Sequence, residues 1–359
     1  MRIAVVDVAA DSGGALSVLQ DFLYYIQSND EFCKANEWIV YTSMPVNIKA
    51  KNVENVVFPR VKKSWLHRLY WERFRAVKEF SKKGIDVIIS LQNTAFKKGY
   101  YKQIIYFHNV LLLACPRKYS LLNASERKYA IYAKYISRYT LRSLRNADFV
   151  VVQSEIVKQD LLKKEPGLNV VIVRPNIYID EKYKYTAELP VKGLVYPTSP
   201  APFKRIEEIV ECVRTYREWF TSHDFKVFIT ISGEENEYAK AIKRSIDDLT
   251  AVIQLTGFLS RDSLLGLYKN NALFISSELE SFPVPLIEAA FIGNPVIAAN
   301  FPYVNESTNG TSNVYLYTPG MISELMDCIR KVSKLKESES GNIFSTYNTW
   351  KDVASLVSK

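Results

Sequence analysis

Residues Ser277–Ala298 read SELESFPVPLIEAAFIGNPVIA and contain a proline-rich turn, an apolar run and a second apolar run after Gly-Asn-Pro. Pro285 suits the first turn of a helix, because its missing N–H would have no intrahelical partner there. We therefore expect a helix over 285–292 and a buried strand over 295–299. Such a loop–helix–strand junction is typical of an α/β unit with a parallel sheet.

Two carboxylates of this stretch, Glu280 and Glu288, are separated by seven residues. The backbone N–H groups of Phe282 and Val284 would be free at the helix N-terminus, where an anion binds well. Glu280 would stand just before those amides and Glu288 about one turn into the helix. A phosphate-bearing ligand could then meet a carboxylate at each end. The alternative is that both glutamates are merely solvated.

The stretch resembles the Glu-x7-Glu signature of glycosyltransferase family 4, the retaining GT-B sugar-nucleotide transferases. Two glycines of the family pattern are replaced here, by Ser281 and Pro283. The matching positions are Ser277, Glu280, Phe282, Pro285, Glu288, Ala289, Gly293, Pro295, Val296, Ile297 and Ala298.

Composition indicates a globular protein of 359 residues, 48% of them hydrophobic, and this length suggests two domains. No run of 18 or more apolar residues is present, and the chain begins with a strand-like segment rather than a signal-peptide pattern, so we expect a cytoplasmic protein. The cysteines form no Cys-x-x-Cys pair and are interpreted as buried thiols. They are Cys33, Cys115, Cys212 and Cys328.

Strands and helices alternate along the chain, which predicts parallel sheets covered on both faces. In the first half, strands are expected at 2–8, 38–42, 53–58, 86–91, 103–107, 148–153 and 170–174, and helices at 15–28, 65–83, 125–145 and 154–164. In the second half, strands are expected at 192–196, 226–231, 251–255, 272–276 and 295–299, and helices at 204–220, 236–248, 261–269, 285–292 and 350–359.

The two alternating runs predict an α/β fold of two Rossmann-like domains, joined by the polar linker Asp180–Lys192. The family resemblance implies the GT-B arrangement, in which the domains face each other across a cleft and the last helix crosses back to the first domain. We therefore expect an acceptor-binding, membrane-facing domain over 1–180 with about 345–359. A donor-nucleotide domain is expected over 190–340.

Residues that follow strands are the candidates for the first domain's site, because ligands of open parallel sheets bind at the carboxyl ends of strands. Gly13 and Gly14 follow the first strand and resemble the family's Gly-Gly, although a plain tight turn is the alternative. His108 can donate a hydrogen bond to a sugar hydroxyl, and the resemblance implies that it faces the donor sugar. A histidine that only holds a loop is the alternative. Gln92 and Asn93 could line the acceptor side.

The second domain begins with a strand and a loop that contains Lys204. Lys204 matches the lysine of the family, whereas Thr198 and Ser199 stand where its usual arginine is expected. Arg205 could supply the second positive charge. A cation matters here because negative charge grows on the nucleotide diphosphate as it leaves. A solvated lysine at a helix start is the alternative reading of Lys204.

Further donor contacts are implied by the same resemblance. Gly233 and Phe258 end two strands, and Phe258 either stacks on the nucleotide base or belongs to the core. Helix N-terminal amides over Phe282–Pro285 would hold the diphosphate together with Lys204. Glu280 would bind a hydroxyl of the sugar, and Glu288 the ribose. No Asp-x-Asp metal motif occurs in the sequence, so we expect neither a metal nor another cofactor.

The excess of positive charge belongs entirely to the first half of the chain. Residues 1–180 hold 28 basic and 16 acidic side chains, net +12, whereas residues 181–359 are net −3. The segment 60–83 interleaves cations with aromatic residues, a composition typical of helices that lie on anionic membranes. A solvated helix with inward-facing aromatics is the alternative. No nucleic-acid module is recognisable, and none is expected as a partner.

Together with the family resemblance, which alone implies retention of anomeric configuration, these observations predict a metal-independent retaining glycosyltransferase, peripheral on the inner face of the plasma membrane. Its donor would be a UDP- or GDP-linked sugar, and its acceptor a glycan, lipid-linked through a polyprenyl carrier. The resemblance suggests a role in bacterial capsule or O-antigen synthesis. Two alternatives remain open at this point. One is a catalytically silent GT-B subunit at the membrane, and the other is a sugar-nucleotide epimerase or phosphorylase with the same fold.

Overall fold

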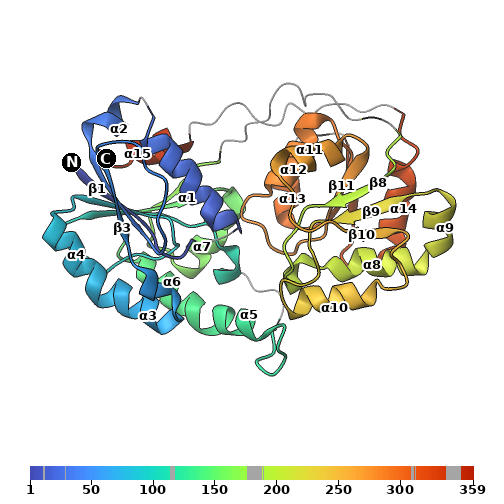
Figure 1. The fold of residues 1–359 in the computed structure, drawn as a ribbon, viewed down its shortest axis with the longest axis horizontal. Coiled ribbons are helices and arrows are strands. Elements are labelled where there is room, and N and C mark those ends of the chain that lie inside the picture. The colour runs from blue at the N-terminus through green and yellow to red at the C-terminus, as the bar shows by residue number, and fades with distance from the viewer. Residues whose placement is uncertain are drawn as a thin grey trace. The chain divides into compact units, whose positions relative to one another are not determined.

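The computed structural model describes residues 1–10, 13–28, 30–113, 118–175, 188, 190–308, 311, 313–336 and 349–359. The chain divides into two compact units (Figure 1). The first comprises Met1–Ala114, Tyr132–Pro175 and Asn348–Lys359, and the second comprises Cys115–Ile131 and Asn176–Tyr347.

The first unit is built on a seven-stranded parallel sheet in the order β3-β2-β1-β4-β5-β6-β7. All seven strands predicted for this half of the chain are present, with ends shifted by one or two residues. They are β1 (Arg2–Asp7), β2 (Glu37–Thr42), β3 (Val53–Val57), β4 (Val87–Ser90), β5 (Lys102–Tyr106), β6 (Phe149–Val152) and β7 (Val170–Ile172).

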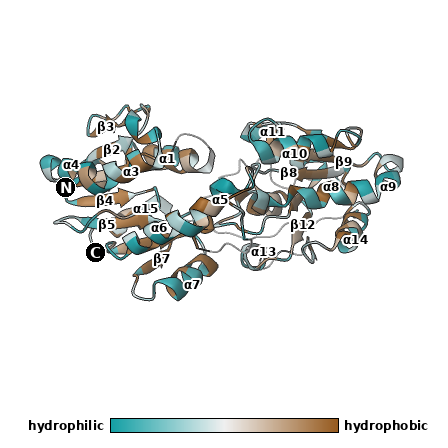
Figure 2. Ribbon diagram, turned by 90° about the horizontal axis from the view of Figure 1, so that it is seen from below, coloured by the Kyte–Doolittle hydropathy of each residue, from teal (hydrophilic) through white to brown (hydrophobic). Residues whose placement is uncertain are grey.

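Alternate residues of β1 enter cores on opposite faces of this sheet, as the period of two requires. Ile3 and Val5 pack in one cluster with Phe22 of α1 (Gly13–Ile26), whereas Ala4 and Val6 pack in another with Phe80 of α4 (Ala76–Lys83). Figure 2 shows the strands as apolar segments covered by helices with polar outer faces. The near-continuous apolar runs in the sequence follow from this burial on both faces.

Helices of residues 1–175 agree with the prediction in position but not in regularity. The predicted helices 65–83 and 125–145 each contain a π-helical turn, η2 (Trp71–Arg75) and η4 (Tyr132–Ile136). The α-helices are α1 (Gly13–Ile26), α2 (Glu31–Ala35), α3 (Trp65–Tyr70), α4 (Ala76–Lys83), α5 (Arg127–Ile131), α6 (Ser137–Leu144) and α7 (Glu155–Lys164). Two 3-10 turns are η1 (Pro59–Lys62) and η3 (Val110–Leu112).

The second unit contains a six-stranded parallel sheet in the order β10-β9-β8-β11-β12-β13. Five of its strands were predicted, and β13 was not. The strands are β8 (Gly193–Tyr196), β9 (Lys226–Ile229), β10 (Ile253–Leu255), β11 (Asn271–Ile275), β12 (Val296–Ala299) and β13 (Val314–Tyr317).

The largest core cluster of the second unit joins its sheet to four of the helices and includes Ile209, Phe274 and Ile329. The predicted helix 204–220 is wrong as a single element, because the chain breaks at Tyr216 and the helix begins only after Arg205. The helices are α8 (Ile206–Thr215), α9 (Arg217–Ser222), α10 (Glu237–Ser245), α11 (Arg261–Tyr268), α12 (Val284–Ile292), α13 (Pro302–Thr308) and α14 (Ile322–Val332), with the 3-10 turn η6 (Pro202–Lys204).

The final helix, α15 (Thr349–Ser355), completes the first unit. The Trp350 ring meets Phe22 edge-on at 4.8 Å between centroids, and its Nε1–H donates to Asp21 Oδ2 at 2.6 Å. Lys102 Nζ donates to the carbonyl of Val357 at 2.9 Å. The predicted return of the last helix to the first domain is therefore confirmed.

Three of the four cysteines lie among the described residues. Cys33, Cys212 and Cys328 are buried free thiols, as predicted, whereas Cys115 lies outside the described residues. Most of the predicted linker Asp180–Lys192 also lies outside them. Among the described helices, none is both long and apolar enough to cross a bilayer.

Candidate functional site

The loops that follow β8 and β11 carry the predicted donor site, and they lie together because these strands are neighbours in the sheet. The Tyr196 hydroxyl donates to the carbonyl of Lys204 at 2.5 Å, and Ser276 Oγ donates to the same carbonyl at 2.9 Å. The backbone N–H of Glu278 donates to the carbonyl of Phe203 at 2.8 Å. These bonds fix the two loops against each other.

Lys204 and Glu280 form a direct ion pair at this edge, with Nζ and Oε1 2.5 Å apart. Both side chains are mostly buried. Burial alone would lower the pKa of the Lys204 ammonium, but Glu280 and the Tyr196 hydroxyl raise it, and the net direction is upward. The ammonium is therefore charged at neutral pH and is available to an anion that can displace Glu280.

Arg205 does not lie free beside Lys204. Its backbone is left-handed, with φ of 51°, and its side chain folds back onto two buried carboxylates. Nη1 donates to Glu278 Oε1 at 2.6 Å, and Nε donates to Glu208 Oε1 at 2.6 Å. The Tyr317 hydroxyl donates to the second oxygen of Glu208 at 2.6 Å. The expectation that Arg205 replaces the missing cation therefore lacks support in this geometry.

Glu288 is buried in α12 and pairs with Arg261 of α11, whose Nη2 lies 2.7 Å from Oε1. Burial raises the pKa of Glu288, and Arg261 acts in the opposite direction. The Tyr268 hydroxyl, also buried, has no hydrogen-bond partner among the described residues. The alternative of a solvated glutamate is excluded for Glu288, and its contact with a ribose stays a prediction.

The N-terminus of α12 offers fewer free amides than the sequence suggested. Pro283 and Pro285 have no N–H, and the N–H of Val284 donates to the carbonyl of Phe282 at 3.0 Å. The N–H of Leu286 donates to the carbonyl of Pro283 at 3.0 Å. The prediction of a free Val284 amide is wrong, because the Pro283 turn closes on itself. Binding of a donor by Phe282–Pro285 stays a prediction.

Two further predicted donor residues lie in loops at the same edge of the sheet. Gly233 has a left-handed backbone, and its N–H donates to Glu235 Oε2 at 3.0 Å. The N–H of Ser232 donates to the other oxygen of Glu235 at 2.5 Å. The Phe258 side chain is 95% exposed, so the alternative of a core residue is excluded. Stacking of Phe258 on a base stays a prediction.

The first unit gathers polar side chains at the carboxyl ends of β1, β4 and β5. The backbone N–H groups of His108 and Asn109 both donate to Asn93 Oδ1, at 2.7 and 2.9 Å. Burial lowers the pKa of His108 to about 4, so the ring is neutral at pH 7. Its Nδ1 lacks a hydrogen-bond partner among the described residues. A neutral imidazole with a spare nitrogen can bind a sugar hydroxyl.

Gly13 and Gly14 are the first residues of α1 rather than part of a loop. A Cβ added at Gly14 would meet no atom within 4 Å, so nothing in the unit itself requires glycine there. The preceding Ser12 lies outside the described residues. A donor contact at these glycines stays a prediction.

Within the described residues, no cluster of three or more potential metal ligands occurs.

Several residues of the candidate site were not predicted from the sequence. Glu278 lies two residues before Glu280, and Glu208, the other carboxylate bound by Arg205, follows Arg205 by about one helical turn. Asp7 ends β1, so its position at the sheet edge was available from the sequence. Nothing in the sequence singled out Glu72 as a site residue, because it is an acidic residue within a basic, helix-forming segment.

Residues 195–348 match the family described as glycosyl transferases group 1. None of the curated proteins compared matches the chain. Among solved structures, the fold resembles sucrose-phosphate synthase from Thermosynechococcus elongatus, with a TM-score of 0.69 and 15% identity over 99% of this chain and 97% of that one.

Two other structures are similar over nearly the whole chain. WaaG, a glycosyltransferase involved in lipopolysaccharide biosynthesis, has a TM-score of 0.67 and 13% identity over 99% of both chains. Anabaena HepE in complex with UDP and glucose has a TM-score of 0.63 and 16% identity over 99% of this chain and 95% of that one. The fold is therefore GT-B, and the comparisons support a glycosyltransferase of the GT-B type.

Proposed function

We propose that this protein is a retaining glycosyltransferase that moves a sugar from a UDP- or GDP-linked donor to a lipid-linked glycan. The observation that carries the proposal is the buried ion pair of Lys204 and Glu280 at the carboxyl edge of the second sheet. A donor diphosphate would take Lys204 from Glu280, and the released carboxylate would accept a hydrogen bond from the sugar. One ligand would thus use both members of the pair.

The reaction breaks the bond between the anomeric carbon and the diphosphate oxygen and forms a bond from that carbon to the acceptor oxygen. The acceptor proton passes to the leaving phosphate, so no protein nucleophile is required. The proposed reaction also uses no metal or other cofactor. Lys204 would stabilise the charge that develops on the diphosphate. Glu288 would bind the ribose, Phe258 the base and His108 a sugar hydroxyl.

The proposed partners draw on the similar structures and on charge. HepE was solved with UDP and glucose, which supports a nucleotide-sugar donor, and the role of WaaG in lipopolysaccharide biosynthesis supports a surface polysaccharide product. The basic segment 60–83 forms α3, η2 and α4, with Leu66, Tyr70 and Phe74 exposed between cations. We propose that it holds the enzyme on the anionic inner face of the plasma membrane.

Calorimetric titration with UDP, GDP and ADP tests the donor site. We expect one nucleotide to bind without added metal and Lys204→Ala to weaken it by about tenfold to a hundredfold, because a charge-assisted hydrogen bond is lost. Lys240→Ala is the matched control, since this exposed lysine of α10 forms its ion pair with Glu237 in the same helix turn. If no nucleotide binds, or if both variants bind like the wild type, the proposed donor site is wrong.

A second candidate, a catalytically silent subunit, is favoured by two observations. Arg205 is engaged by Glu208 and Glu278, and Val284 donates its N–H within its own turn. Both features reduce the stabilisation of a leaving diphosphate. Nucleotide binding without transfer to any lipid-linked acceptor would favour this candidate, whereas transfer would exclude it.

A further inference from the structure

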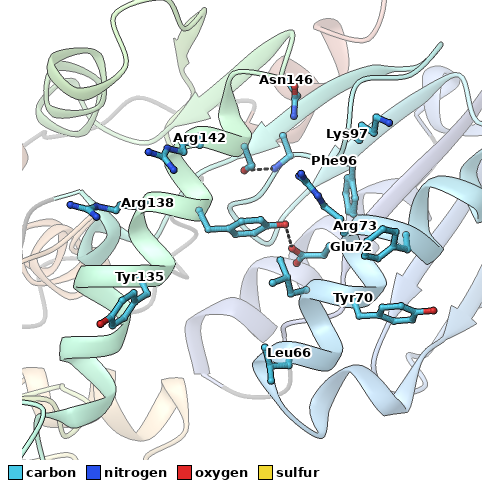
Figure 3. Close-up of a pocket in the computed structure, with 15 residues that line it drawn as sticks. Leu66, Tyr70, Glu72, Arg73, Phe96, Lys97, Tyr135, Arg138, Arg142 and Asn146 are labelled. Carbon is cyan, nitrogen blue, oxygen red and sulfur yellow. Dashed lines mark hydrogen bonds between the residues drawn. The ribbon is translucent and has the colours of Figure 1, made fainter.

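An open groove of about 770 Å³ runs along the first unit between two helical segments (Figure 3). One side is formed by α3 and η2, with Leu66, Tyr70 and Arg73, and the other by η4 and α6, with Tyr135 and Arg138. Each segment contains one of the two π-helical turns. Such bulges are frequent at functional sites in helices.

The floor of this groove is apolar and exposed. Leu66 is 70% exposed, Tyr70 and Phe74 are each 58% exposed, and Tyr135 is 55% exposed. Single exposed apolar side chains are ordinary, but here Leu66, Tyr70 and Phe74 line one side of the groove and Tyr135 lines the other (Figure 3), with the Tyr70 and Phe74 ring centroids 5.5 Å apart. Exposed apolar side chains gathered in this way often mark a site for a partner or a lipid. The alternative that the aromatics of the basic segment all face inward is therefore wrong for Tyr70 and Phe74.

The groove is also positively charged. Arg73, Arg138 and Arg142 line it, are exposed, and form no ion pair with a carboxylate among the described residues. The acid among the described lining residues is Glu72, which is buried and already bound. Its Oε1 accepts from Arg68 Nε at 2.7 Å and from Gln92 Nε2 at 2.8 Å.

A smaller polar cavity of about 190 Å³ adjoins the groove, and Glu72 and Tyr139 line both. The Tyr139 hydroxyl donates to Glu72 Oε2 at 3.1 Å, a bond drawn in Figure 3. Asp7 Oδ2, Gln92 Oε1 and His108 Nδ1 belong to residues that line this cavity, and none has a hydrogen-bond partner among the described residues. The Gln92 amide oxygen and the unprotonated ring nitrogen of His108 can each accept a hydrogen bond from a hydroxyl group.

We propose that the groove and the cavity together bind one ligand, a sugar linked through phosphate to a polyisoprenyl chain. The chain lies on the apolar floor, the phosphates meet Arg73, Arg138 and Arg142, and the sugar places its hydroxyls in the polar cavity. This inference rests on the proposed function and gives its lipid-linked acceptor a site.

Charge and shape favour this occupant over a bulk membrane lipid. An apolar floor favours a hydrocarbon chain, three arginines without an ion pair among the described residues favour an anion, and the adjoining polar cavity favours hydroxyl groups. A diacyl lipid satisfies the first two requirements without the third. An acidic peptide satisfies the second and leaves the floor uncovered. A polyisoprenyl-phosphate sugar satisfies all three requirements, because it carries a hydrocarbon chain, a phosphate and sugar hydroxyls.

Vesicle sedimentation of the full chain tests the phosphate and chain subsites. The probe is phosphatidylcholine vesicles that contain a polyisoprenyl phosphate, compared with vesicles that contain phosphatidylglycerol at the same charge. We expect preferential binding to the former, and a loss of affinity of about a hundredfold in the triple variant R73Q/R138Q/R142Q. The matched control is Arg75→Gln, an exposed arginine of the same π-helical turn that does not line the groove.

Equal binding to the two vesicle types, or an equal effect of Arg75→Gln, would overturn the inference in favour of general membrane docking. The polar cavity is tested with a polyisoprenyl-diphosphate-linked hexose, for which Asp7→Asn should lower affinity while binding of the sugar-free phosphate is kept. If Asp7→Asn weakens neither probe, the cavity does not hold the sugar.

Nucleotide titration separates this inference from the proposed function. The R73Q/R138Q/R142Q variant should bind nucleotide like the wild type, because its substitutions lie in the first unit. Nucleotide binding without a lipid preference would overturn the acceptor site and leave the donor site standing. Lipid preference without nucleotide binding would overturn the donor site alone.

Discussion

Arg205 illustrates how one residue can hold two loops together. Its left-handed backbone turns the side chain toward Glu208 at the start of α8 and toward Glu278 in the loop after β11. Glycine adopts this conformation without strain, and arginine does so at a cost. We infer that the ion pairs compensate for that cost, because each carboxylate is buried and gains a cation.

Removal of the Arg205 side chain should therefore destabilise the second unit. In Arg205→Ala, two buried carboxylates lose their shared cation, and breaking a buried ion pair costs about 3–5 kcal/mol. Urea unfolding measures the change. Arg214→Ala is the control, because its exposed pair with Glu211 should contribute less than about 1 kcal/mol. A loss of stability no larger than in the control would contradict the bridging role.

Acid stability should depend on His108. The pKa of its ring is lowered to about 4 by burial, from an ordinary value of about 6.5, so the unfolded chain takes up a proton before the folded one does. Its contribution to stability is present above the unfolded pKa and is lost as the pH falls toward 4. His108→Gln should lose less stability than the wild type between pH 7 and pH 4.

Asp7 gives the opposite sign and serves as the control. Burial raises the pKa of its carboxyl to about 7, so its contribution is present at low pH and is lost as the pH rises. Asp7→Asn should therefore lose less stability than the wild type between pH 4 and pH 7. Urea unfolding at the two pH values gives both slopes, and identical slopes in wild type and variants would refute the assignments.

At the scale of elements, α12 shows how a short segment decides ligand contacts. Pro283 caps the helix and closes a turn in which the N–H of Val284 donates to Phe282. A helix N-terminus attracts anions only through N–H groups that remain available. The positive end of this helix is therefore less open to phosphate than its position at the sheet edge suggests.

Pro283→Gly should strengthen nucleotide binding. Glycine restores an N–H and relaxes the turn, and one amide donor to a charged group contributes about 1.5–3 kcal/mol, offset in part by lost rigidity. We expect a gain in affinity of about fivefold in calorimetric titration with the nucleotide that binds the wild type. Pro302→Gly at the start of α13 is the control and should leave affinity unchanged. Unchanged or weaker binding in Pro283→Gly would show that the diphosphate does not reach this helix.

The sequence predicts the strands well and the irregularities poorly. Apolar runs such as those of β6 and β11 predict strands correctly, because both faces of a parallel sheet are buried. The break at Tyr216 and the π-helical turns leave no mark in the periodicity, since one extra residue per turn shifts the pattern only locally. The proximity of Lys204 and Glu280 could be predicted, because both residues lie in loops that the sequence identifies. The partners of Arg205 could not be predicted, because Glu278 reaches Arg205, and Tyr317 reaches Glu208, only through the tertiary structure.

At the scale of the whole molecule, the first unit is discontinuous in sequence. Trp350 of α15 packs on Phe22 of α1, and Thr349 Oγ1 donates to the carbonyl of Arg174 at 2.7 Å. Val353, Leu356 and Val357 belong to the same core as β1. Residues of α15 thus complete a hydrophobic core to which β1 also contributes.

Trp350→Ala should destabilise the first unit more than the second. Truncation of a buried tryptophan costs about 3–5 kcal/mol, and the Asp21 carboxylate loses its donor as well. Hydrogen exchange resolved by segment should show faster opening of β1 and α1, with β8 and β11 unaffected. Lys351→Ala, an exposed neighbour in α15, is the control. Equal loss of protection in both units would contradict the assignment of α15 to the first unit alone.

This division of the core has a consequence for synthesis on the ribosome. Domains generally fold in the order in which they emerge, from the N-terminus onward. Here Trp350 and Val357 follow the whole second unit in the chain, so this part of the first core can form only after the second unit has been synthesised. The sheet and the core cluster of the second unit fall within residues 191–335, so they are complete before Trp350 is added. The unit whose synthesis begins first is therefore completed after the unit that follows it.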